Sequence, residues 1–85
     1  MVSSKHKRTL AAIFAAPVRA SIRWLDIEAL NLALGGTISE GAGSRVVLEL
    51  NGKVAVFHRP HPRPETDKGA VVAVRKFLIE AGIIP

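Results

Sequence analysis

The chain has 85 residues, no cysteine, 12 Lys and Arg against 7 Asp and Glu, and a formal net charge of +5. The length predicts one domain over residues 1–85, in which residues 1–23 form a basic N-terminal helix and connector. The absence of cysteine excludes disulfides and thiolate zinc sites. A hydrophobic content of 48% excludes a disordered basic tail.

The basic charge is concentrated in two blocks. Residues 1–23 carry five basic side chains and no acidic one, and residues 45–64 carry four basic side chains against one acidic. Between these blocks, residues 24–44 carry three acidic side chains and no basic one. Such blocks suit a phosphate backbone, an anionic membrane surface or an acidic protein partner, although ordinary solvated faces are the alternative.

The sequence does not predict a membrane protein. No apolar run approaches the roughly 18–20 residues that a membrane span requires. Basic residues followed by the apolar stretch 10–16 resemble the start of a signal peptide, but Pro17 and Arg19 interrupt that stretch. We therefore expect a cytoplasmic protein with no membrane partner.

Two helices are predicted in the first half of the chain. The first runs from about Lys5 to Ala16, with Ser4 as its N-cap and Pro17 as its stop. The second runs from about Leu25 to Leu34 and is followed by two glycines, one of which is expected in the left-handed conformation. Its apolar residues recur at helical spacing. Both helices are therefore expected to pack one face against a core.

Strand signals follow. Thr37–Ser39 predicts a short strand, and two alternating runs flank Asn51-Gly52, the dipeptide typical of a type I′ hairpin turn. A last helix begins near Thr66 or Asp67 and continues to about Ala81. The resulting order is α-α-β-β-β-α. This order predicts an α+β two-layer sandwich, in which helices cover one face of a three-stranded antiparallel sheet.

The hairpin turn also fixes which side chains share a face. If Asn51 and Gly52 are the turn, Leu50 pairs with Lys53 and the ladder continues outward to Arg45 opposite His58. One face then holds the core residues Val46, Leu48, Leu50, Ala55 and Phe57. The other face holds Arg45, Val47, Glu49, Val54, Val56 and His58, and is expected to meet solvent or a ligand.

A histidine beside an arginine suits RNA cleavage, in which the ribose 2′-hydroxyl attacks its own phosphate. Histidine exchanges protons near neutral pH, and a guanidinium matches the geometry of phosphate. A solvated surface pair is the alternative interpretation. The three histidines lack the spacing of a helical metal pair and no acidic cluster accompanies them. No metal and no cofactor are therefore expected.

The chain resembles the HicA toxin family of type II toxin–antitoxin systems. The resemblance covers residues 24–85 and is carried by Trp24-Leu-Asp-Ile-Glu-Ala-Leu30, Leu34-Gly-Gly36, Gly43-Ser44-Arg45, His58-Arg-Pro-His-Pro62, Lys68-Gly69 and Ala81-Gly82-Ile83. It implies a fold like the double-stranded-RNA-binding domain and a ribosome-independent mRNA endoribonuclease. It also implies neutralisation by a HicB antitoxin, with oligomers formed only through that complex. The basic N-terminal helix goes beyond the minimal family pattern.

One departure from the family bears on catalysis. The family usually has Gly-Ser-His at the start of its second strand, and that histidine is the catalytic residue, whereas here Arg45 follows Gly43-Ser44. The hairpin register offers His58 as its replacement, with Arg45 as a phosphate-binding cation. The further RNA contacts that we predict are Lys5, Lys7, Arg8, Arg59, His61 and Lys68. The alternative is a catalytically inactive module that binds RNA or the antitoxin.

Overall fold

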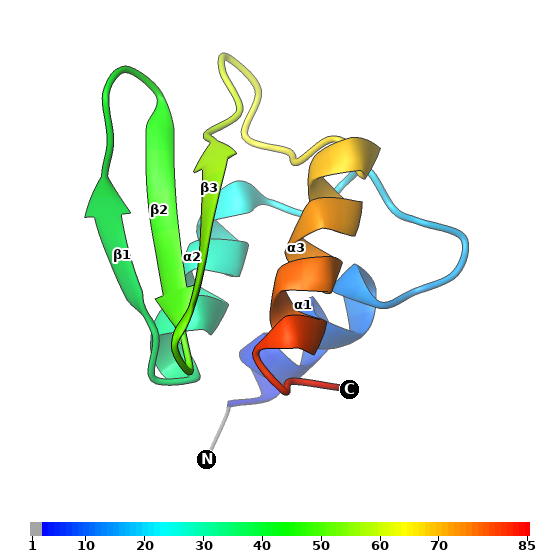
Figure 1. Ribbon diagram of the computed structural model, residues 1–85. Coiled ribbons are helices and arrows are strands. Elements are labelled where there is room, and N and C mark those ends of the chain that lie inside the picture. Colours follow the sequence, from blue (N-terminus) through cyan, green and yellow to red (C-terminus); the bar gives the residue numbers. More distant parts are fainter. Residues whose placement is uncertain (1–2) are drawn as a thin grey trace.

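The computed structural model describes residues 3–85, so that residues 1 and 2 of the predicted N-terminal segment lie outside the described residues. The elements are α1 (Ser4–Ile13), α2 (Trp24–Ala33), β1 (Thr37–Glu40), β2 (Arg45–Leu50), β3 (Lys53–His58) and α3 (Lys68–Glu80). The three helices lie on one side of the sheet (Figure 1). The predicted order and the α+β class are therefore confirmed.

The sheet is antiparallel with strand order β1-β2-β3, and its hairpin has the predicted register. Asn51 and Gly52 both have positive φ angles, 51° and 81°, as a type I′ turn requires. The Asn51 side-chain amide donates a hydrogen bond of 2.8 Å to the carbonyl of Ala81, just beyond α3. The turn that sets the register is thus also attached to the helical layer.

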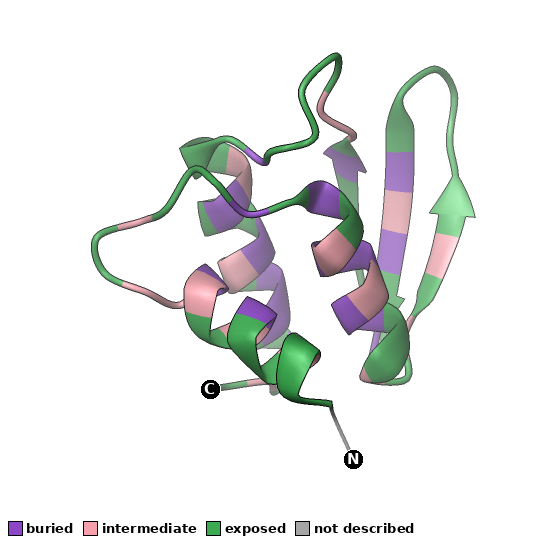
Figure 2. Cartoon of the chain, turned by 180° about the vertical axis from the view of Figure 1, so that it is seen from behind, coloured by how far each residue is buried: buried purple, intermediate pink, exposed green. Residues whose placement is uncertain are grey.

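Side-chain alternation divides the sheet into a buried and an open face. Val46, Leu48, Leu50 and Phe57 point toward the helices and are buried, while Ala55 is half-buried. Along β2, the residues with opposite parity are exposed or half-buried, so the colours alternate in Figure 2. Trp24 of α2 and Phe77 of α3 contact Phe57 with ring centroids 5.4 and 6.2 Å apart. The core therefore lies between one face of the sheet and the helices, and the other face is uncovered.

The prediction for the first helix was wrong at both ends. Ser3, not Ser4, is the N-cap, and its side chain accepts a hydrogen bond from the His6 backbone N–H. The helix ends at Ile13 instead of Ala16. Pro17 disfavours helical geometry only at Ala16, whereas Arg75 of α3 supplies hydrogen-bond donors to the carbonyls at the end of the helix. Its guanidinium donates to the carbonyls of Ile13 and Ala15 at 2.8–3.1 Å. The end of α1 is thereby attached to α3.

The other two helices follow the prediction more closely. Helix α2 begins at Trp24, one residue before the predicted start at about Leu25, and the Trp24 side chain is buried. Gly35 has a φ of 95°, which confirms the predicted left-handed residue after this helix. Asp67 is the N-cap of α3 and accepts a hydrogen bond from the Ala70 N–H. Within residues 3–85, none of the helices combines the length and the apolar character that crossing a membrane demands.

We predict that Gly36→Ala destabilises the junction between α2 and the sheet. Asn31 of α2 donates from its side-chain amide to the carbonyls of Thr37 and Glu49, which holds Gly36 close to both partners. A Cβ at position 36 would lie closer than 3.0 Å to the Glu49 carbonyl oxygen and to the Asn31 amide. Overpacking of this kind costs about 1–3 kcal/mol. Urea denaturation measures the loss in the free energy of unfolding.

The matched control for this substitution is Gly69→Ala in the first turn of α3. A Cβ there would meet only the Asp67 carboxylate, at 3.4 Å. Because alanine has the higher helix propensity, the control variant should be unchanged or up to about 1 kcal/mol more stable. Equal denaturation midpoints for the two variants would contradict the packing that we describe at Gly36.

Candidate functional site

Arg45 and His58 lie directly opposite each other at one end of the open sheet face. Arg45 begins β2, His58 ends β3, and both are exposed. The Arg59 N–H donates to the Ser44 carbonyl at 2.9 Å, so residues 44 and 59 form a hydrogen-bonded pair of the ladder. The neighbouring pair of Arg45 and His58 is then of the non-hydrogen-bonded kind, in which the Cα atoms are only about 4.5 Å apart. The imidazole and the guanidinium therefore share one patch of the surface.

An apolar strip continues from this pair along the open face. Val56 and Val54 of β3 are 58% and 62% exposed, and Val47 of β2 is half-buried. Val47 pairs with Val56 in the register, so the three side chains are neighbours on the sheet. The open face thus combines a cation, an imidazole and a group of exposed valines.

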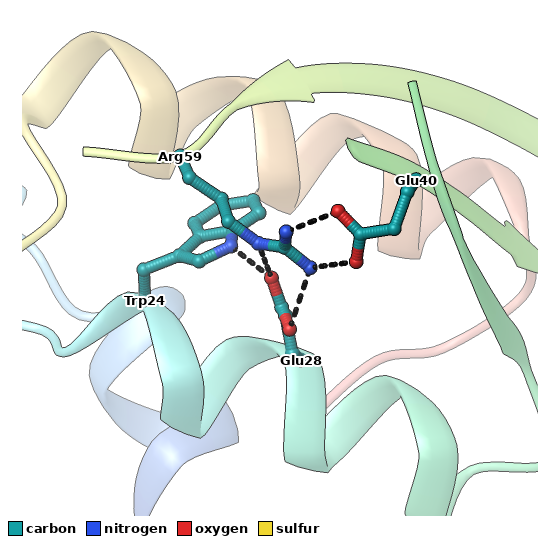
Figure 3. Close-up of polar contacts among 4 residues, drawn as sticks. All are labelled: Trp24, Glu28, Glu40 and Arg59. Atoms are coloured by element: carbon teal, nitrogen blue, oxygen red, sulfur yellow. Dashed lines mark hydrogen bonds and ion pairs between the residues drawn. The ribbon is translucent and has the colours of Figure 1, made fainter. Parts of the chain in front are cut away.

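Arg59 points to the opposite side of the sheet from His58. Its Nε donates to Glu28 Oε2 of α2 at 2.7 Å, and its Nη2 donates to Glu40 Oε2 of β1 at 2.8 Å. The indole N–H of Trp24 donates to the same Glu28 oxygen (Figure 3). We call these four residues, Trp24, Glu28, Glu40 and Arg59, the Arg59 network. It joins α2, β1 and the end of β3.

Two members of the Arg59 network, Glu40 and Arg59, have shifted pKa values. The hydrogen bond from Arg59 holds the pKa of Glu40 below its usual value against the opposing effect of desolvation, and the charge of the guanidinium lowers it further. Hydrogen bonds to Glu40 and then to Glu28 raise the pKa of Arg59 above its already high ordinary value. The Arg59 guanidinium is therefore charged and hydrogen-bonded to two carboxylates. Because it lies on the helix side of the sheet, it is not brought together with Arg45 on the open face.

The other residues predicted to contact RNA lie on three separate segments. Lys5, Lys7 and Arg8 are exposed on α1, and the Lys5 ammonium lies 3.5 Å from an Asp26 carboxylate oxygen of α2. His61 is exposed in the loop after β3, and Lys68 is the exposed first residue of α3. Within residues 3–85, no side-chain hydrogen bond or ion pair links any of these residues to Arg45 or His58.

Sequence reasoning missed the two carboxylates of the Arg59 network. The signal was present in the strand alternation, since an outward His58 places Arg59 on the same side as the buried Phe57. A guanidinium on the core side needs carboxylate partners, because an unpaired charge there is costly. Glu28 was a candidate partner because it lies one helical turn after Trp24, on the same face of the helix. In the described part of the chain, no group of three or more His, Cys, Asp or Glu side chains is placed to hold a metal ion.

The comparison with protein families places the chain in a known class. A family model described as "HicA toxin of bacterial toxin-antitoxin" matches residues 24–83, which is most of the chain. The family consists of bacterial toxins that act together with an antitoxin and whose substrate in general is RNA. The chain belongs to this HicA toxin family and is the toxin of a toxin–antitoxin pair. Neither the curated proteins nor the solved structures gave a match.

The matched region contains the whole sheet, α2 and α3, and with them Arg45, His58 and the Arg59 network. The match begins at Trp24, the first residue of α2. Helix α1 and the connector that follows it therefore lie outside the matched region. This agrees with the prediction that the basic N-terminal helix goes beyond the minimal family pattern.

We predict that Arg59→Met destabilises the protein far more than Arg63→Met. The first substitution leaves Glu28, whose side chain is only 12% exposed, without its cation. Breaking a fully buried pair costs about 3–5 kcal/mol, and we expect about 1–3 kcal/mol here because the Arg59 side chain is 31% exposed. Arg63, exposed in the same loop, should change stability by no more than about 0.5 kcal/mol. Equal losses in urea denaturation would contradict the structural role of the network.

We also predict that Glu40→Gln reduces the dependence of stability on acid. Because the pKa of Glu40 is lowered in the folded state, its charged form stabilises the protein above the unfolded-state pKa of about 4.3. This contribution is lost as the pH falls through the folded-state pKa. Between pH 6 and pH 3 the wild type should therefore lose more stability than the variant. Glu80→Gln, at an exposed position of α3, is the control and should follow the wild-type profile; coinciding profiles of all three would contradict the prediction.

Proposed function

We propose that the protein is an endoribonuclease that cleaves mRNA in the cytoplasm, with His58 and Arg45 as its catalytic pair and a HicB-like protein as its antitoxin. The single observation that carries the proposal is the position of an exposed imidazole directly opposite an exposed guanidinium on the open sheet face. Arg45 occupies the place that usually holds the family's histidine. The two residue types have in effect exchanged strands and still share one face.

The proposed reaction requires proton transfer and stabilisation of negative charge. His58 removes the proton from the ribose 2′-hydroxyl, whose oxygen attacks the adjacent phosphorus. The bond from phosphorus to the 5′-oxygen breaks, and that oxygen takes up a proton from the imidazolium or from water. The products are a 2′,3′-cyclic phosphate and a 5′-hydroxyl. Arg45 binds the phosphoryl oxygens, on which negative charge increases in the transition state. No metal ion takes part in this scheme.

The Arg59 network supports the proposal by fixing the end of β3. Arg59 follows His58 directly and is held by hydrogen bonds to α2 and β1. A catalytic group on a fixed backbone needs less reorganisation to reach the reacting atoms. The valines beside the pair support a protein partner on the same face, because exposed apolar groups of this kind are typical of interfaces. An antitoxin seated there would cover His58 and Arg45 together.

A second candidate function rests on one observation. Because Arg45 stands where the family usually has its catalytic histidine, the chain is a candidate for a module that binds RNA or the antitoxin without cutting RNA. Purified protein incubated with a defined RNA distinguishes the two functions. Binding that falls steeply with salt but yields no cleavage product would favour the module.

We predict that His58→Ala lowers the rate of RNA cleavage by about 10²–10⁴-fold, which is the usual contribution of general acid–base catalysis. Cleavage of a labelled RNA on denaturing gels measures the rate, and loss of growth arrest on expression in a bacterial host gives a second readout. His6→Ala, on α1, removes a histidine elsewhere and should leave the rate within a few fold of the wild type. Undiminished cleavage and growth arrest in His58→Ala would show that His58 is not catalytic.

A further inference from the structure

Two hollows lie side by side where α1, the connector after it and the start of α2 meet. Their volumes are about 530 and 460 Å³, and both are lined by Lys5, Arg23 and Asp26. The two hollows adjoin each other at these three residues, and we call the pair of hollows the N-terminal groove. Besides Arg59, the charged residues that line it are Lys5, Arg8, Arg19, Arg23, Asp26 and Arg63.

The N-terminal groove carries an excess of uncompensated positive charge. Its one acidic side chain among those residues, Asp26, lies 3.5 Å from the Lys5 ammonium and is thereby neutralised. Arg8, Arg19, Arg23 and Arg63 are exposed. Within the described residues 3–85, no carboxylate lies within 4.0 Å of any of these four guanidinium groups. The groove therefore suits an anionic ligand.

Backbone hydrogen bonds hold the walls of the groove together. The Trp24 N–H donates to the Pro64 carbonyl at 3.0 Å, and the Thr66 N–H donates to the Ile22 carbonyl at 2.7 Å. An isolated antiparallel bridge between Arg23 and Glu65 lies between these two bonds. The connector and the loop after β3 thus run as a short ladder, so the depression is formed before any ligand binds.

The groove reaches the end of the sheet that carries the catalytic pair, on the side toward which Arg59 points. Arg59 and Pro60, the two residues that follow His58, line its first hollow. To contact both sites, a polynucleotide on the open face has to pass over this end of the sheet and follow the loop after β3, whose residues Arg63 and Pro64 also line the first hollow. Four of the groove's cations, at positions 5, 8, 19 and 23, precede the region that matches the family. The N-terminal segment thus supplies these four cations, whereas the start of α2 and the loop after β3, which complete the first hollow, belong to the matched region.

We infer that the N-terminal groove binds the phosphate backbone of the RNA substrate, as a second contact beside the catalytic pair; this inference rests on the proposed ribonuclease function. Guanidinium groups bind phosphate through two parallel hydrogen bonds. The second hollow, which holds Arg8 and Arg19, is lined mainly by basic and small polar side chains, with Ile22 buried, and so lacks the large exposed apolar side chains on which a protein interface depends. Leu25, which is 70% exposed, lines the first hollow. The exposed valines that suit a protein partner lie instead on the open sheet face.

The test measures RNA affinity against salt in the full chain carrying His58→Ala, which prevents cleavage. A fluorescent single-stranded RNA of about 20 nucleotides is titrated by anisotropy between 50 and 300 mM KCl. In this background Arg8→Gln/Arg19→Gln is compared with Lys53→Gln/Lys76→Gln, which removes the same charge at exposed positions outside the groove. The groove pair should lower the slope of log affinity against log salt by about 1.4, since each lost single-strand phosphate contact removes about 0.7. The control pair should leave the slope unchanged.

Three results would overturn the inference. If both pairs change the slope equally, RNA is bound without occupying the groove, and the proposed ribonuclease function stands alone. If the groove pair weakens binding of the antitoxin and leaves the slope of log RNA affinity against log salt unchanged, the groove is a binding site for the protein partner. If the unsubstituted chain neither binds nor cuts RNA at 50 mM salt, the proposed function fails and the inference fails with it. Urea denaturation of both pairs verifies that they are equally folded.

Discussion

The two-residue turn at Asn51 and Gly52 determines the direction of every side chain in β2 and β3. Because side chains alternate strictly along a strand, a turn of one more residue would move the side chains of one strand to the opposite face relative to those of the other strand. The observed register places His58 outward opposite Arg45, and it places the next residue, Arg59, inward toward the helices. The candidate catalytic pair and the structural ion pair are therefore two consequences of one local turn.

The inward guanidinium of Arg59 connects parts of the chain that would otherwise be independent. It contacts Glu28 of α2 and Glu40 of β1 from the position directly after β3. The same chain segment then continues into the loop that pairs with the connector before α2 and forms a wall of the N-terminal groove. The end of the sheet, the start of α2 and the groove thus share one set of contacts, so that a ligand in the groove lies close to the backbone that holds His58.

The distribution of charge explains how a basic chain of this size leaves so many cations available. The three acidic residues of segment 24–44 all pair within the molecule: Asp26 with Lys5, and Glu28 and Glu40 with Arg59. These acids therefore neutralise two cations, and within residues 3–85 they leave Arg8, Arg19, Arg23 and Arg63 without a carboxylate partner. Their charge faces solvent on the groove, where it raises the local concentration of a polyanion.

The sequence by itself determined the order of the elements, the hairpin register and the position of Arg45 opposite His58. These features depend on an Asn-Gly turn and on the periodicities of strand and helix, which are local signals. Only the tertiary structure decided the end of α1 at Ile13, the partners of Arg59 and the shape of the groove. Arg75 lies 62 residues from Ile13 in the chain, and Glu28 lies 31 residues from Arg59. Such contacts depend on how the helices pack on the sheet, and no periodicity within either segment specifies them.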